Sequence, residues 1–136
     1  MTDIYFPMLL GHLVGDYLLQ NNWMALNKGK ASLLGYSSCT THCVIYAAAV
    51  CAVMDVLRLD WFIFVAAGHF LLDKYSVGDW WLKVIGGRSP SVFVSTPAEG
   101  NSMTYLQAGF TAVVYAVADN TMHLLIMFFG WRMLWA

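Results

Sequence analysis

Four long apolar stretches dominate the sequence and restrict how the chain can fold. They cover about residues 4–23, 34–57, 61–77 and 104–135. A helix that crosses a lipid bilayer needs roughly 20 mostly apolar residues. Only 11% of the 136 residues are charged and 60% are hydrophobic, whereas a soluble domain carries about 25% charged residues. The sequence therefore predicts an all-α fold, with a single transmembrane domain over residues 1–136 built as a bundle of four helices.

The segments between these stretches differ in character. Residues 24–33 contain two lysines and a glycine and indicate a polar loop. The long connection over residues 78–103 opens with Trp80 and Trp81 among charged residues, which is typical of a short amphipathic segment at a membrane interface. Residues 96–99 have the spacing of a capping box with proline at the first helical position, and they predict a helix start. We expect the last stretch to form one helix, because neither Pro nor Gly interrupts its central part.

The placement of Lys and Arg predicts the orientation of the chain in the membrane. The first and third connections together hold Lys28, Lys30, Lys74, Lys83 and Arg88, whereas the opposite side holds Arg58 and Arg132. Basic residues gather in cytoplasmic loops, so these two connections are expected in the cytoplasm and both termini on the outer side. The N-terminus lacks the basic region of a secretory signal, so the first apolar stretch is expected in the mature protein. The net charge of −1 offers no basic patch for nucleic acid, and the lipid bilayer is the expected partner.

Ionisable residues inside the apolar stretches follow one pattern. An aspartate at the centre of a spanning helix costs roughly 2.5–3.5 kcal/mol, so its presence calls for a function. Three stretches carry a His and an Asp four residues apart, and the remaining one carries a single His: His12/Asp16, His69/Asp73, Asp119/His123 and His42. This spacing places both members of a pair on one face of a helix. None of the four histidines lies in a predicted loop, so the pattern indicates one shared polar site.

The order within each pair follows the direction of its helix. His precedes Asp in the first and third stretches, which run toward the cytoplasm, whereas Asp precedes His in the last stretch, which runs the other way. His42 has Ser38 in the position of the aspartate. Alternating spans therefore predict a layer of histidines and, about one helical turn nearer the cytoplasm, a layer of aspartates. The alternative interpretation is that the pairs only form hydrogen bonds that hold the helices together.

Such a layer suits a metal site. Imidazole and carboxylate groups are the usual ligands of zinc, manganese and non-haem iron, and we expect a divalent ion, zinc or manganese. The candidate ligands are His12, Asp16, His42, His69, Asp73, Asp119 and His123. They outnumber the four ligands of one tetrahedral zinc, so they suit two ions, or one ion whose ligands are hydrogen-bonded by the remaining carboxylates. For catalysis, an aspartate that does not bind the ion is a candidate general base: Asp16, Asp73 or Asp119.

Two further residues are candidates for contacting a substrate. Gln20 lies one turn beyond Asp16 on the same helix face, although a plain interhelical hydrogen bond explains it equally well. Lys74 follows Asp73, and its ammonium group is expected to reach the membrane interface, with anion binding as the alternative. The three cysteines, Cys39, Cys43 and Cys51, lie in one apolar stretch and are expected to be small packing residues.

The segment from His12 to Ala25, followed by His42 and then by Asp73 and Lys74 after His69, resembles a family of small bacterial and phage membrane proteins of unknown function. Its opening pattern, HxxGDxxLQ, is the most specific part, and the similarity covers nearly the whole chain. The resemblance implies a multi-pass protein of the bacterial inner membrane and no established reaction. The His/Asp pattern is also similar, more distantly, to bacterial inner-membrane metal-dependent hydrolases, which implies hydrolysis of an ester or phosphoester at the membrane.

Together these features favour a membrane-embedded, metal-dependent hydrolase that acts on a lipid-linked or phosphoester substrate. Two non-enzymatic alternatives use the same residues, either as an ion or metal pathway or as a structural layer that specifies helix pairing. A b-type haem protein is a further alternative, because paired histidines on facing helices ligate haem. The aspartate beside each of three histidines disfavours it. A homo-oligomer is compatible with a chain of this size, although no motif requires one.

Overall fold

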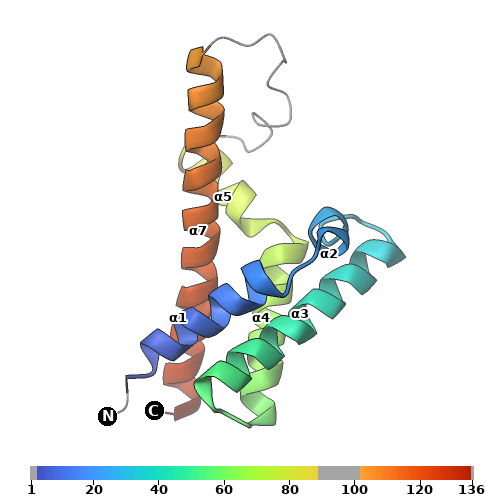
Figure 1. Ribbon diagram of the computed structural model, residues 1–136, viewed down its shortest axis with the longest axis vertical. Helices are drawn as coiled ribbons and strands as arrows, with labels where there is room; N and C mark the ends of the chain where they lie inside the picture. Colours follow the sequence, from blue (N-terminus) through green and yellow to red (C-terminus); the bar gives the residue numbers. More distant parts are fainter. Residues whose placement is uncertain (1–2, 89–101, 136) are drawn as a thin grey trace. The chain divides into compact units, whose positions relative to one another are not determined.

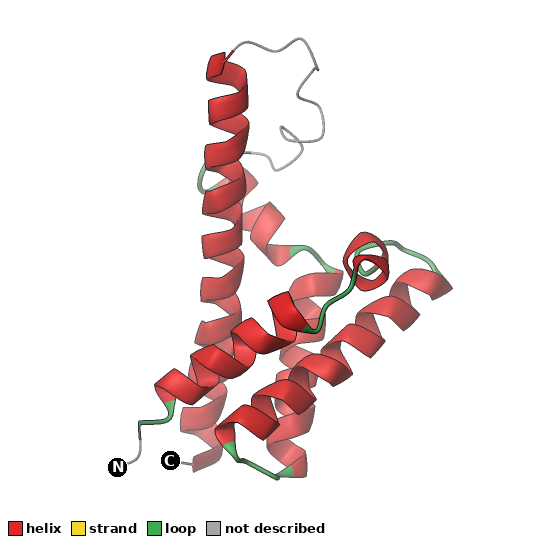
Figure 2. Ribbon diagram, viewed as in Figure 1, coloured by secondary structure: helices red, strands yellow, loops and turns green. Residues whose placement is uncertain are grey.

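The structure is a computed structural model that describes residues 3–88 and 102–135 (Figure 1). Every regular element within these ranges is a helix (Figure 2), which confirms the all-α prediction. The chain divides into two compact units, and each is treated separately below. The first unit comprises Met1–Tyr75 with His123–Ala136, and the second comprises Ser76–Met122.

The first unit is organised around one long helix. Its elements are α1 (Tyr5–Leu13), the π-helical turn η1 (Val14–Leu18), α2 (Asn22–Asn27), α3 (Leu33–Met54), α4 (Leu59–Lys74) and the C-terminal part of α7 (Ser102–Trp135). Helix α3 packs against α1, η1, α2 and α4, and α4 lies beside it as the second arm of a hairpin (Figure 1). Since α3 contacts all four of these elements, a side chain near its middle can meet residues from several of them.

Local sequence signals explain where these helices begin and end. Asn21 caps α2 by accepting a hydrogen bond from the backbone N–H of Met24, and Ser32 caps α3 by accepting one from Gly35. Both are residue types that favour the N-cap position, because their side chains satisfy a backbone donor that the helix leaves unpaired. Helix α3 ends at Asp55, which adopts the left-handed conformation with φ of 55°. Aspartate tolerates this conformation better than bulkier residues.

An apolar core forms where α1, α3, α4 and the end of α7 meet. It contains Met8, Tyr46, Ala47, Val50, Cys51, Trp61, Val65 and Met127. Trp61 is fully buried, and the rings of Trp131 and Trp135 pack edge-on against it with centroids 5.3 and 5.6 Å away. All three cysteines are buried thiols, and none forms a disulfide. This core packs together α1, α3, α4 and the end of α7, which are the helices that carry the four histidines.

Two glycines let the first helical segment approach α3 closely. A Cβ atom added at Gly11 would lie 2.9 Å from the Cα of Val50, and one added at Gly15 would lie 2.6 Å from the Tyr46 ring. Real Cβ atoms essentially never come so close, so backbone or ring would have to move. These glycines stand directly before His12 and Asp16, so the close approach brings both ionisable residues against α3.

The second unit contains α5 (Val77–Val84) and the part of α7 that ends at Met122. Helix α5 is the segment expected at a membrane interface. Trp80 and Trp81 are largely exposed on it, and Lys83 pairs with Asp79 one turn earlier at 2.5 Å. A Cβ atom added at Gly78 would lie 2.7 Å from Oδ1 of Asp119, so this glycine gives the aspartate its space. The segment is a short helix, and its location at an interface stays a prediction.

The predicted spans are confirmed only in part. Among the described residues, two helices are long and apolar enough to cross a membrane, α3 and α7, judged by length and composition. The prediction of one helix over residues 4–23 is wrong, because the chain leaves the helical path after Leu18 and starts α2 at Asn22. The prediction of a polar loop over residues 24–33 is wrong for residues 24–27. They belong to α2, which begins after the Asn21 cap.

The remaining predictions for these segments have mixed outcomes. Helix α4 has 16 residues and ends at Lys74, so it is shorter than the length expected of a spanning helix. The last stretch is one continuous helix from Ser102 to Trp135, as expected from the absence of Pro and Gly in its central part. The predicted helix start at residues 96–99 lies outside the described residues.

Replacing Gly15 with Ala tests the close approach of η1 to α3. The added methyl group meets the Tyr46 ring, and overpacking of this kind costs about 1–3 kcal/mol. We expect the melting temperature of the detergent-purified protein to fall. The matched control is Gly109→Ala on α7, where an added Cβ has nothing within 4 Å and alanine is the better helix former. Equal melting temperatures for both variants would show that the Gly15 contact is not tight.

Candidate metal centre

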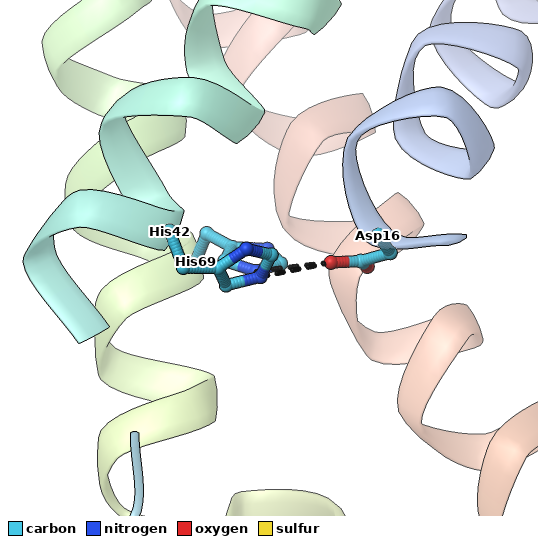
Figure 3. Close-up of side chains that lie close together, drawn as sticks. All are labelled: Asp16, His42 and His69. Atoms are coloured by element: carbon cyan, nitrogen blue, oxygen red, sulfur yellow. Dashed lines mark hydrogen bonds and ion pairs between the residues drawn. The ribbon is translucent and has the colours of Figure 1, made fainter. Parts of the chain in front are cut away.

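Three elements of the first unit bring a carboxylate and two imidazoles to one point. His42 comes from the middle of α3, His69 from α4 and Asp16 from η1, and both rings point toward the carboxylate (Figure 3). Oδ1 of Asp16 lies 3.1 Å from Nε2 of His42 and 3.3 Å from Nε2 of His69. The two Nε2 atoms are 2.9 Å apart. Two ring nitrogens and one carboxylate oxygen therefore face the same small volume.

Asp73 brings a second carboxylate to the same two rings. Its Oδ2 atom lies 3.2 Å from Nε2 of His69, one turn earlier on α4, and 3.4 Å from Nε2 of His42. The same oxygen accepts a hydrogen bond from the ammonium group of Lys28 at 2.7 Å. His42 and His69 thus form a central pair with one aspartate oxygen on each side.

The two other histidines lie against the far oxygens of these carboxylates. Nδ1 of His12 is 3.3 Å from Oδ2 of Asp16, and Nε2 of His123 is 3.7 Å from Oδ1 of Asp73. Each carboxylate therefore joins the central pair to an outer histidine. All four histidines, from α1, α3, α4 and α7, belong to one connected polar cluster inside an otherwise apolar unit. Of the seven residues predicted to converge, this unit brings together His12, Asp16, His42, His69, Asp73 and His123, whereas Asp119 belongs to the second unit.

Burial makes this cluster energetically demanding. The four histidines and Asp73 are buried, whereas the side chain of Asp16 keeps 14% of its surface exposed. A buried charge is costly unless it is paired and hydrogen-bonded. The two carboxylates therefore need compensating positive charge, and Lys28 is the nearest fixed cation to either of them in the described structure. Asp16 marks the side on which the cluster opens.

Packing against Tyr46 orients the imidazole rings. The Tyr46 ring stacks on His69 with a centroid distance of 3.7 Å, and His69 in turn packs against His123 at 4.2 Å. The Tyr46 hydroxyl shares a hydrogen bond with Nδ1 of His12 at 2.8 Å and lies 3.6 Å from the sulfur of Met127. Nδ1 of His12 thus contacts both Tyr46 and Asp16.

The spacing of the central atoms fits a metal ion. Ligands about 2.0–2.2 Å from a tetrahedral zinc ion stand roughly 3.3–3.6 Å from one another. The distances that join His42 and His69 to each other and to the two aspartates run from 2.9 to 3.4 Å. Two triads have ligand atoms that all lie within 4.8 Å of one another, Asp16/His42/His69 and His69/Asp73/His123, and His69 is common to both. A bound ion would spread the ligand atoms of the Asp16/His42/His69 triad by only a few tenths of an ångström.

The donor types also fit, with one departure from common metal sites. Two imidazoles and two carboxylates suit zinc, manganese or non-haem iron. Ligating histidines usually donate their other ring N–H to a carboxylate, a carbonyl or water. Nδ1 of His42 and Nδ1 of His69 have no hydrogen-bond partner among the residues that the structure describes. Ring stacking and the contacts at Nε2 therefore hold these two rings in position.

The π-helical turn explains how Asp16 reaches the cluster. Residues 14–18 continue α1 with a wider turn, and Gly15 within it is buried against Tyr46. A π-helical turn shifts the side chains that follow it relative to a regular helix, and such turns occur frequently at functional sites. Asp16 consequently contacts His42 and His69 as well as His12, its partner four residues earlier.

The other residues predicted for the site have distinct environments. The amide nitrogen of Gln20 lies 2.9 Å from Nε2 of His42, so Gln20 touches the central pair. Lys74 directs its ammonium group to the carbonyl oxygens of Lys28 and Lys30, at 3.3 and 2.6 Å. Asp119 belongs to the second unit, beside Gly78. Ser38 donates to the carbonyl of Gly35 within its own helix.

Sequence reasoning missed two residues of the cluster. Lys28 was assigned to a polar loop, and nothing in its local sequence indicates that the segment folds back onto Asp73. Tyr46 follows His42 by four residues on α3 and therefore shares its helix face. That spacing was a usable signal, because it is the same one that links His12 with Asp16.

The fold and the cluster define a class of all-α protein with a buried His/Asp site that is geometrically able to hold a metal ion. Over residues 4–136 the chain matches a family described as a protein of unknown function, DUF3307, and it belongs to that family. The expected membership of an uncharacterised family is confirmed. No curated protein and no solved structure gives a significant match to the chain.

Replacing Tyr46 with Phe tests the hydrogen bond that orients His12. The ring stack on His69 is preserved, but the buried Nδ1 of His12 loses its closest hydrogen-bond partner. A lost hydrogen bond of this kind costs about 0.5–1.5 kcal/mol, so we expect a lower melting temperature in detergent. Tyr75→Phe, at an exposed tyrosine, is the control and should melt like the wild type. A Tyr46→Phe variant as stable as the control would contradict the assigned bond.

Proposed function

We propose that this protein is a membrane-embedded, metal-dependent hydrolase with a single divalent ion, zinc or manganese, at the His/Asp cluster. Asp16, His42 and His69 are its three protein ligands, which leaves a further position for water or substrate, and Asp73 lies beside both rings. The observation that carries the proposal is the convergence of two Nε2 atoms and one carboxylate oxygen, from three elements, at distances of 2.9–3.3 Å. Purely structural helix pairing does not require three such groups to face one point.

The residues around the ion have separate tasks in this proposal. His12 lies 3.3 Å from the outer oxygen of Asp16 and helps to fix the direction of its inner oxygen, and His123 lies 3.7 Å from the outer oxygen of Asp73. Gln20 lies at the edge of the central pair, where its amide can bind a polar group of a substrate. A bound divalent ion supplies Lewis acidity and an activated water at neutral pH. The partly exposed Asp16 lies on the side from which water can enter.

A membrane location is supported by the surface of the first unit. Many large apolar side chains are exposed, among them Phe6, Leu33 and Ile63 on three different helices. An apolar surface this extensive is unusual for a soluble monomer. Together with the two long apolar helices, this supports a membrane location. The proposal extends to a multi-pass inner-membrane protein with four spans, in which α1, η1 and α4 lie within the bilayer, and the placement of Lys and Arg favours outward-facing termini. A lipid-linked phosphoester is the proposed substrate, because it can reach such a site from the bilayer.

The metal content of the detergent-purified protein tests the centre directly. We expect stoichiometric zinc or manganese in the wild type, and loss of most of it in His69→Ala and Asp16→Asn. Asp60→Asn is the matched control, because Asp60 is exposed and pairs with Arg58 away from the cluster. A wild-type protein that binds neither ion, or a His69→Ala variant with unchanged metal content, would refute the proposed centre.

Turnover distinguishes the hydrolase from its non-enzymatic alternatives. The metal-loaded protein should release phosphate from p-nitrophenyl phosphate or from a short-chain lipid phosphate, and Asp16→Asn should reduce the rate at least about a hundredfold. Ion or metal flux into liposomes without turnover would instead assign the same residues to a pathway.

A further inference from the structure

Lys28 lies beside Asp73 at the edge of the cluster, and nothing in the metal chemistry above uses it. Its ammonium group lies 2.7 Å from Oδ2 of Asp73. Its side chain is 23% exposed, whereas that of Asp73 is 4% exposed. The ammonium group therefore sits on the outer side of the carboxylate, between the buried centre and the surroundings. A ligand that approaches the ion from this side meets the ammonium group first.

A second lysine holds the backbone at this position. The Lys74 ammonium group is buried, donates to the carbonyl oxygens of Lys28 and Lys30, and lies 3.8 Å from the centroid of the Tyr36 ring. Gly35 at the start of α3 packs against the carbonyl of Lys30 so closely that no Cβ would fit. The segment after α2 is thus fixed to both α3 and α4, and the Lys28 ammonium group has a defined position beside the centre.

The charges of the groups around Lys28 indicate what kind of ligand the site would bind. Asp16 and Asp73 contribute two negative charges, and Lys28 and Lys74 contribute two positive ones, so the four groups are balanced without an ion. A divalent ion bound by neutral imidazoles adds two positive charges in a region of low dielectric. Uncompensated buried charge is costly. A dianionic ligand restores the balance.

We propose that Lys28 and the bound ion together form a binding site for a dianionic phosphate group, as in inorganic phosphate or a phosphate monoester. One phosphate oxygen contacts the ion and another accepts a hydrogen bond from the Lys28 ammonium group, which stays within reach of Asp73. Hydrogen bonds between charged groups are stronger than those between neutral groups. Lysine commonly binds phosphate, and it does so through its single positive charge. This inference rests on the proposed metal centre and narrows its substrate class to phosphate monoesters.

Isothermal titration of the zinc-loaded protein with inorganic phosphate tests the assignment. We expect Lys28→Met to weaken phosphate binding about tenfold or more, and Lys28→Arg, which keeps the charge, to retain most of the affinity. Lys30→Met is the matched control, because Lys30 carries the same charge two residues away and bonds to Asn27 instead. Lys28→Gln is a second neutral variant in case the methionine variant does not fold. Zinc content is measured on every sample.

The possible outcomes separate this inference from the proposed function. Zinc binding with equal phosphate affinity in wild type, Lys28→Met and Lys28→Gln would overturn the role of Lys28 and leave the metal centre intact. Phosphate binding that does not depend on zinc would also overturn it. Absence of zinc binding would refute the metal centre, and this inference with it. A parallel titration with dihexanoyl phosphatidic acid, against dihexanoyl phosphatidylcholine as control, shows whether the preferred source of the phosphate is a lipid headgroup.

Discussion

The structure of the first unit depends on the polar contacts between two carboxylates and two imidazoles within apolar helices. Asp16 and Asp73 are separated by more than fifty residues, yet each contacts both His42 and His69. Without those partners each carboxylate would be an unpaired charge in an apolar environment. At roughly 2.5–3.5 kcal/mol each, the two would take up a large part of a typical total stability of about 5–15 kcal/mol. The helices therefore have to pack so that these groups meet.

Several unrelated features serve this packing. Gly11 and Gly15 allow α1 and η1 to approach α3, and the π-helical turn points Asp16 at the rings. Tyr46 stacks on His69 and bonds to His12, so it supports the cluster from the core side. Lys74 fixes the segment that carries Lys28. Geometry at the cluster is thus set by the fold as a whole, which is the condition for a site that binds one ligand in one position.

The sequence predicted much of this cluster, because helical periodicity is a short-range property. A spacing of four residues was enough to pair His12 with Asp16 and His69 with Asp73, and the apolar surroundings indicated that the pairs meet. It could not predict that η1 becomes π-helical, or that the chain leaves the helical path after Leu18. The π-helical turn accompanies a contact of Gly15 with Tyr46, 31 positions further along the chain, and the new helix begins at the Asn21 cap. Lys28 was missed because its role depends on the Lys74 contacts, which join residues far apart in the chain.

The predicted arrangement in two layers is also refined by the structure. A histidine and an aspartate four residues apart lie on successive helical turns, but their side chains extend toward each other and come into contact. The ring nitrogens of His42 and His69 lie among the oxygens of Asp16 and Asp73. The donor atoms therefore form one centre, with His12 and His123 at its outer edges. Ser38, which was expected in the layer of the aspartates, instead bonds within α3.

X-ray absorption at the zinc edge of the zinc-loaded wild-type protein tests the central claim most directly. The account predicts a first shell of nitrogen and oxygen only, at about 2.0–2.2 Å, with the outer-shell scattering of two imidazole rings. Sulfur scattering at about 2.3 Å would place the ion at the buried pair Cys39 and Cys43 instead. That result, or a shell without imidazole, would contradict a centre built on Asp16, His42 and His69.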